Sequence, residues 1–106
     1  MTDPGLRVLV VGSGGREHAL ATAIERSPRC AALFTAPGSD AMPGVRLEAR
    51  SDDVCAIVDA CTVLDVNLVV VGPETPLAAG LADALIGKGV AVFGPTRDAA
   101  RRGRAR

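Results

Sequence analysis

The chain has 106 residues, 48% of them hydrophobic, which predicts one domain that buries a core of its own without metals or disulfides. Its formal net charge is zero, and with two Phe, no Tyr and no Trp it lacks the aromatic platforms on which single-stranded nucleic acids stack. Three cysteines without the spacing of a zinc site predict buried thiols, and no apolar run suits a signal peptide or membrane span, so we expect a soluble, cytoplasmic protein.

Short runs rich in Val and Leu predict the strands of a sheet. Four of them are too brief for helices and are bounded by Gly, Pro or Asn: residues 6–11, 31–36, 68–71 and 90–93. Residues 45–49 form a weaker fifth candidate. Because the runs lack polar alternation, we expect strands buried on both faces, as in a parallel sheet covered by helices.

Three helices are predicted between these runs. The first spans about residues 15–26, stops before Pro28 and turns four apolar residues inward: Ala19, Leu20, Ala23 and Ile24. The second follows Ser51 as its N-cap, has Asp52 and Asp53 in its first turn, and carries one apolar stripe: Val54, Ile57, Val58, Cys61 and Leu64. The third begins at Thr75 and Pro76, ends at Gly87 or Gly89, and carries three leucines: Leu77, Leu81 and Leu85.

The order of these elements predicts an α/β fold. Right-handed crossovers between the strands give an open, mostly parallel, Rossmann-like sheet with helices on both faces. We expect this domain to span residues 1–96. Ligands of such a sheet bind outside the carboxyl ends of its strands, so the loops that follow the strands are the candidate site.

The loop after the first strand, "GSGGREH", is the first candidate. Its glycines let the backbone turn sharply and present N–H groups at a helix N-terminus, which suits a phosphate, and Arg16 could add a charged contact. The alternative is that the glycines only allow a tight turn. A dinucleotide fits less well, because the third glycine of its fingerprint would fall at position 17, where the chain has Glu17, and no acid ends the second strand.

Two further residues have more than one interpretation. Glu74 lies between Pro73 and Pro76, where it could accept hydrogen bonds from sugar hydroxyls or only favour the start of a helix. His18 is the single histidine, and we assign it no catalytic role.

The last ten residues are strongly basic. Residues 97–106 have a net charge of +4, against −4 for residues 1–96. Either this segment is a frayed, solvated end, or it docks on an acidic partner or, weakly, on nucleic acid. We expect neither a nucleic acid nor a membrane as its main partner.

Taken together, the motifs resemble the phosphoribosylamine-glycine ligase family. The stretches "RVLVVGSGGREHALA", "APG", "VVVGPETPLAAGLADAL" and "VFGPT" follow the order of that family's N-terminal, pre-ATP-grasp domain, over about Arg7 to Ala100. The resemblance implies a substrate-binding lobe for a phosphorylated sugar amine, phosphoribosylamine, which is ligated to glycine in de novo purine biosynthesis. It implies contacts from seven residues: Ser13, Gly14, Gly15, Arg16, Pro37, Gly38 and Glu74.

The resemblance also implies what this chain does not supply. In that family ATP and Mg2+ bind a separate ATP-grasp lobe, so we expect no cofactor and no catalytic residue on this chain, and an ATP-grasp chain as its partner. The sequence departs from the family pattern after "APG", where Ser39 and Asp40 begin a shortened loop. The alternatives are a non-catalytic binding or scaffold module and, third, a nucleotide-binding regulatory domain.

Overall fold

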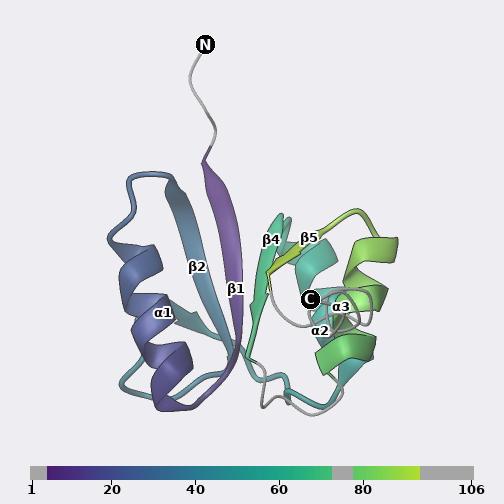
Figure 1. Cartoon of the computed structure of the whole chain (residues 1–106), viewed down its shortest axis with the longest axis horizontal. Coiled ribbons are helices and arrows are strands. Elements are labelled where there is room, and N and C mark those ends of the chain that lie inside the picture. Colours follow the sequence, from purple (N-terminus) through teal and green to yellow (C-terminus); the bar gives the residue numbers. More distant parts are fainter. Residues whose placement is uncertain (1–4, 73–77, 94–106) are drawn as a thin grey trace, which may run out of the picture.

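Five strands form one parallel sheet in the order β3-β2-β1-β4-β5 (Figure 1). The structure is a computed structural model that describes residues 5–72 and 78–93. The strands are β1 (Leu6–Gly12), β2 (Cys30–Pro37), β3 (Val45–Arg46), β4 (Leu68–Val71) and β5 (Ala91–Phe93). The helices are α1 (Gly15–Glu25), α2 (Val54–Leu64) and α3 (Ala78–Gly87). The predicted Rossmann-like, parallel α/β architecture is therefore confirmed.

The central strand β1 explains the unbroken apolar runs of the sequence. Its residues Val8 to Val11 pair with β2 on one side and with β4 on the other, and each is at most 2% exposed. Successive side chains of a strand point to opposite faces, and both faces are covered here. Leu9 and Val11 belong to the core beneath α2 and α3, whereas Val8 and Val10 belong to the core beneath α1.

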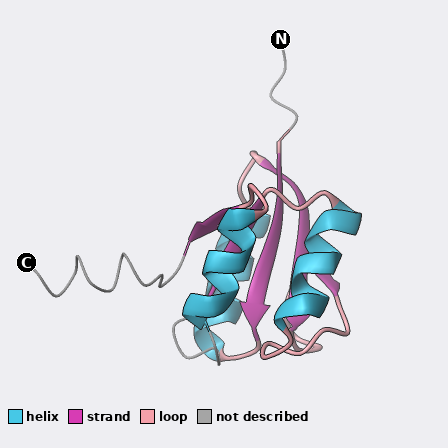
Figure 2. Cartoon of the chain, turned by 90° about the vertical axis from the view of Figure 1, so that its right-hand side faces the viewer, coloured by secondary structure: helices cyan, strands magenta, loops and turns pink. Residues whose placement is uncertain are grey.

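Helices lie on both faces of the sheet, as expected. In Figure 1 α1 covers one face, and α2 and α3 cover the other; Figure 2 looks onto the second face, with these two helices in front of the strands. The stripe predicted for α2 is confirmed, since Ile57 and Cys61 are buried and its other members are half-buried. The last two leucines predicted for α3, Leu81 and Leu85, are fully buried. Its predicted start at Thr75, Pro76 and Leu77 lies outside the described residues.

The structure corrects the predicted inner face of α1. Ala19 and Ala23 are exposed, whereas Glu17 and Ala21 are buried, with Leu20 and Ile24 half-buried beside them. The true stripe begins at Glu17 and recurs at intervals of three and four residues. A stripe that starts with a carboxylate is not visible as an apolar pattern, so the predicted face is displaced by roughly a quarter of a turn and shares only Leu20 and Ile24 with the true stripe.

The start of α2 is also different from the prediction. Asp53, not Ser51, is the N-cap, and its carboxylate accepts a hydrogen bond of 3.0 Å from the backbone N–H of Ala56. Asp52 precedes the helix and pairs instead with Arg50. Both acids therefore lie before the first helical turn, where an aspartate side chain replaces a missing backbone acceptor.

The prediction of three buried thiols is wrong for Cys55, which is exposed on α2, while Cys30 is half-buried and Cys61 is buried. Burial raises the pKa of the Cys61 thiol to about 11, because the thiolate would be poorly solvated in the core. Among the described residues there is no group of three potential metal ligands. The helices of this part of the chain include none long and apolar enough to cross a membrane.

Candidate functional site

Three loops meet at the carboxyl edge of the sheet. Gly12, at the end of β1, is in register with Pro37, at the end of β2. The Gly38 N–H donates to the Gly12 carbonyl oxygen at 3.2 Å, and the Gly72 N–H donates to the Val11 carbonyl oxygen at 3.3 Å. The glycine loop after β1 therefore has the loop after β2 on one side and the start of the loop after β4 on the other, which is where ligands of this fold class bind.

Gly12 is required by the fold itself. Its backbone has a φ of +135°, and a Cβ at this position would lie 2.6 Å from Cγ of Glu17. Both conditions exclude larger residues, so the alternative that the glycines serve a tight turn is correct for Gly12.

Gly15 is different, because no described neighbour requires a glycine there. A Cβ at this position would meet no atom of residues 5–72 and 78–93 within 4 Å, and the residue begins α1 with ordinary helical backbone. Glycine in a helix is about 1 kcal/mol less favourable than alanine. The absence of a side chain at Gly15 keeps the space in front of the helix open.

The buried side chain of Glu17 holds the glycine loop from its inner side, a role that was not predicted from the sequence. It is 1% exposed, and its Oε1 accepts a hydrogen bond of 3.1 Å from the Gly14 N–H. The Gly14 amide is thus directed into the protein. The available signal was the spacing, since a glutamate three residues after a helix N-cap commonly reaches back to the backbone N–H of that cap.

The outer surface of the loop carries the groups that can meet a ligand. Ser13, Gly14, Gly15 and Arg16 are all exposed. No described residue accepts a hydrogen bond from the backbone N–H of Gly15 or of Arg16. The first N–H groups of a helix lack partners within the helix and lie at its positive end, so these two amides suit an anion.

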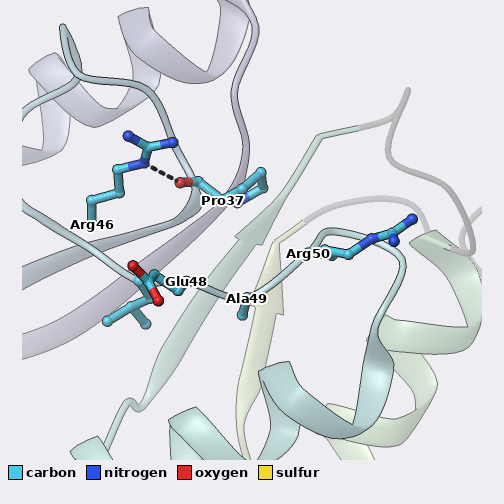
Figure 3. Close-up of a pocket in the computed structure, with 6 residues that line it drawn as sticks. Pro37, Arg46, Glu48, Ala49 and Arg50 are labelled. Atoms are coloured by element: carbon cyan, nitrogen blue, oxygen red, sulfur yellow. Dashed lines mark hydrogen bonds between the residues drawn. The ribbon is translucent and has the colours of Figure 1, made fainter.

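The second loop is a tight turn that is hydrogen-bonded to a side chain of β3. Gly38 has a φ of +67°, and Arg46 of β3 donates from Nε to the Pro37 carbonyl oxygen at 2.9 Å, as Figure 3 shows. Nη1 of the same side chain donates to the Asp40 carboxylate at 2.7 Å. A cavity of about 390 Å³ lies beside the turn and is lined by Pro37 and by residues 46–50.

Thr35 lies beneath this turn and was not singled out from the sequence. It is 1% exposed, and its hydroxyl has no hydrogen-bond partner among the described residues. A Cβ on Gly38 would come within 2.4 Å of that hydroxyl oxygen, so the turn packs directly on it.

The structure brings together six of the seven residues proposed for the site. Ser13, Gly14, Gly15 and Arg16 are on one loop, and Pro37 and Gly38 are on the neighbouring loop. The seventh residue, Glu74, lies outside the described residues. Asp40 and Asp52 are exposed, and they pair with Arg46 and Arg50, respectively.

Comparison with known proteins identifies the family of the chain. The family described as phosphoribosylglycinamide synthetase, N domain, matches residues 6–102. The phosphoribosylamine–glycine ligase of Rhizobium meliloti (strain 1021) is 46% identical over 101 residues, which is 91% of this chain and 23% of that protein. The trifunctional purine biosynthetic protein adenosine-3 of Gallus gallus is 46% identical over 99 residues, 90% of this chain and 10% of that protein.

The chain thus spans about a quarter of the length of the ligases that it matches. Among solved structures, a Rex-family repressor, RSP, has a similar fold, with a TM-score of 0.55 and 14% identity over 95% of this chain and 57% of the repressor. That likeness concerns the fold alone. The family match over residues 6–102 and the fold agree, and the chain belongs to the phosphoribosylglycinamide synthetase N-domain family.

Proposed function

We propose that this chain is the substrate-binding lobe of a phosphoribosylamine–glycine ligase and that it holds a phosphorylated sugar amine at the carboxyl edge of its sheet. The phosphate is placed at the N-terminus of α1, against the amides of Gly15 and Arg16 and the guanidinium of Arg16. The sugar lies toward the Pro37–Gly38 turn and toward Glu74. Ligation to glycine requires ATP and Mg2+ on an ATP-grasp lobe, which we place in another part of the protein or on a partner chain.

The observation that supports this proposal most strongly is Gly15. Among the described residues, the surroundings require a glycine at position 12 but not at position 15, where a methyl group would meet no described atom within 4 Å. A residue without a side chain is explained there if a ligand approaches the backbone closely. Two amides without partners among the described residues and the exposed Arg16 point the same way, because a phosphate accepts several hydrogen bonds at once.

The geometry changes one detail of the expected contacts. The Gly14 N–H donates to Glu17, so we do not assign it to the phosphate. Glu17 instead fixes the path of the loop, and Gly15 and Arg16 carry the proposed anion contacts. A substitution at Glu17 would therefore change the conformation of the loop as well as the affinity for the ligand. It cannot be used to measure the binding contacts alone.

An amide NMR titration with ribose 5-phosphate, a stable stand-in for the labile sugar amine, tests the proposal. We expect saturable shifts at Gly15, Arg16 and Gly38. Arg16→Ala should weaken binding by about tenfold or more, the value of one charge-assisted contact. Gly15→Ala should keep the fold, since its methyl group would meet none of the described atoms, yet weaken binding by at least about tenfold through contact with the phosphate.

The controls separate the phosphate site from general attraction between charges. Arg26→Ala removes an exposed arginine that follows the far end of the same helix, and it should leave the affinity unchanged. Ribose without phosphate should bind much more weakly than ribose 5-phosphate. A flat titration of the folded wild type, or equal losses in the Arg26→Ala and Arg16→Ala variants, would instead favour the scaffold module without a substrate site.

A further inference from the structure

We propose that Arg46 is the positioning residue of the substrate site, because it holds the Pro37–Gly38 turn against the glycine loop. This inference rests on the proposed function for its effect on binding, although its structural part can be measured without ligand. Arg46 does not belong to either loop of the site. It lies on β3, at the outer edge of the sheet, and it acts on the site through the turn.

Arg46 contacts both ends of the segment 37–40, which contains the Pro37–Gly38 turn. Nε donates to the carbonyl oxygen of Pro37 at 2.9 Å, and Nη1 donates to the carboxylate of Asp40 at 2.7 Å. The two N–H groups of one planar guanidinium thus connect the first residue of the segment with its fourth. We call this pair of hydrogen bonds from one guanidinium the fork of Arg46. Because the guanidinium is planar, the fork fixes both the direction and the distance of the two acceptors, which the compact ammonium of lysine cannot do.

The turn has little other support on this side. On this side Pro37 borders the cavity of about 390 Å³ and is not packed closely against the other described residues that line it, several of which Figure 3 shows. From below, the Thr35 hydroxyl touches Gly38 but has no hydrogen-bond partner among the described residues. The backbone pairing of β3 with β2 brings Arg46 level with Thr35, and from there its side chain reaches along the strand to Pro37.

The position of the turn matters because it is bonded to the glycine loop. Next to the carbonyl that Arg46 holds, the Gly38 N–H donates to the carbonyl oxygen of Gly12. Gly12 in turn packs on Glu17, which holds the Gly14 amide. A displacement of the turn therefore reaches the loop that is proposed to bind the phosphate.

Arg46 is suited to positioning more than to anion binding. Its charge is matched by Asp40, and the two side chains are 53% and 97% exposed. Exposed ion pairs of this kind contribute little to stability. We therefore expect loss of the fork to change the geometry of the site while the domain stays folded.

The test compares Arg46→Lys with Arg50→Lys. Arg50 lines the same cavity and forms a similar fork, but with Asp52 on its own segment and not with the turn. Without ligand, Arg46→Lys should shift the Gly38 amide signal and raise its hydrogen-exchange rate by about tenfold, whereas Arg50→Lys should change neither. The affinity for ribose 5-phosphate should fall by about fivefold in Arg46→Lys and by less than about twofold in Arg50→Lys.

Thermal unfolding separates positioning from a general loss of structure. The Tm of Arg46→Lys should fall by no more than roughly 4 to 8 °C, the equivalent of one weak ion pair in a domain of this size. Equal behaviour of the two variants at Gly38 would overturn the inference. A loss of affinity without a change at Gly38 would also overturn it, because Arg46 would then contact the ligand itself.

Failure of the proposed function gives a different result. In that case the wild type shows no saturable shifts with ribose 5-phosphate. The exchange rate of Gly38 still decides whether Arg46 holds the turn, since it is measured in the absence of ligand.

Discussion

Gly38 is the position where a single methyl group should disturb the domain most specifically. A Cβ there would lie 2.4 Å from Oγ1 of Thr35 and 3.0 Å from its Cβ, and the backbone has a φ of +67°. Thr35 is fully buried in β2, between β1 and β3, so it cannot move aside without disturbing the sheet. Gly38→Ala therefore introduces two separate penalties.

The magnitude follows from these two contributions. The left-handed backbone costs an alanine roughly 1 to 2 kcal/mol, and forcing an additional methyl group into a packed site costs about 1 to 3 kcal/mol. We expect the free energy of unfolding to fall by about 2 to 5 kcal/mol, a large part of the 5 to 15 kcal/mol typical of a domain. The Tm should fall by roughly 10 °C or more.

A double-mutant cycle in urea tests the cause. Thr35→Ala removes a hydroxyl without a described partner together with the buried γ-methyl group, and by itself it should lower the free energy of unfolding by about 1 to 2 kcal/mol. Combined with Gly38→Ala, it should recover at least about 1 kcal/mol, because the closest overlap is gone while the backbone strain remains. The reasoning is refuted if Gly38→Ala is neutral, or if the two changes add within about 0.5 kcal/mol.

Three further predictions concern α2. Ile57→Ala should lower the free energy of unfolding by about 2 to 5 kcal/mol, because it opens a cavity in the larger core. Val63→Ala, at an 81% exposed site, should change it by less than about 0.5 kcal/mol. Equal effects of the two substitutions in urea denaturation would contradict the burial of Ile57 in the core. Asp53→Ala should lower the free energy of unfolding by about 0.5 to 2 kcal/mol, because the helix loses its N-cap, and Asp52→Ala should lower it by less than about 0.5 kcal/mol. The opposite order of the two variants in thermal melts would mean that Asp53 is not the cap. The buried Cys61 thiol keeps its proton up to a pKa of about 11, whereas the unfolded thiol ionises near pH 9, so stability should fall as pH rises from 9 to 11. The slope should be smaller in Cys61→Ala, and an unchanged slope in denaturation measured against pH would contradict this assignment.

The sequence by itself determined the architecture. Runs such as Val8 to Val11 have no polar alternation, and only a strand covered on both faces can bury them fully. The spacing of Ile57 and Cys61 placed the inner face of α2 correctly, because all members of that stripe are apolar. The loops at the carboxyl ends of the strands followed from the order of the elements, and their likeness to the ligase family followed from the motifs that they carry.

Tertiary structure decided how the site is supported. Glu17 was a reason to reject a dinucleotide, yet its burial under Gly12 depends on the turn of the chain between β1 and α1. The fork of Arg46 joins residues from β3 and from the loop after β2, and no local pattern in the sequence encodes a contact between them. Local patterns report which face of a segment is apolar, whereas a buried polar group or a fork between loops depends on where distant segments meet. The difference between Gly12 and Gly15 shows this most simply: both are glycines of one loop, but only the positions of the described atoms around them show that a Cβ at Gly12 would collide with Glu17, whereas a Cβ at Gly15 would not.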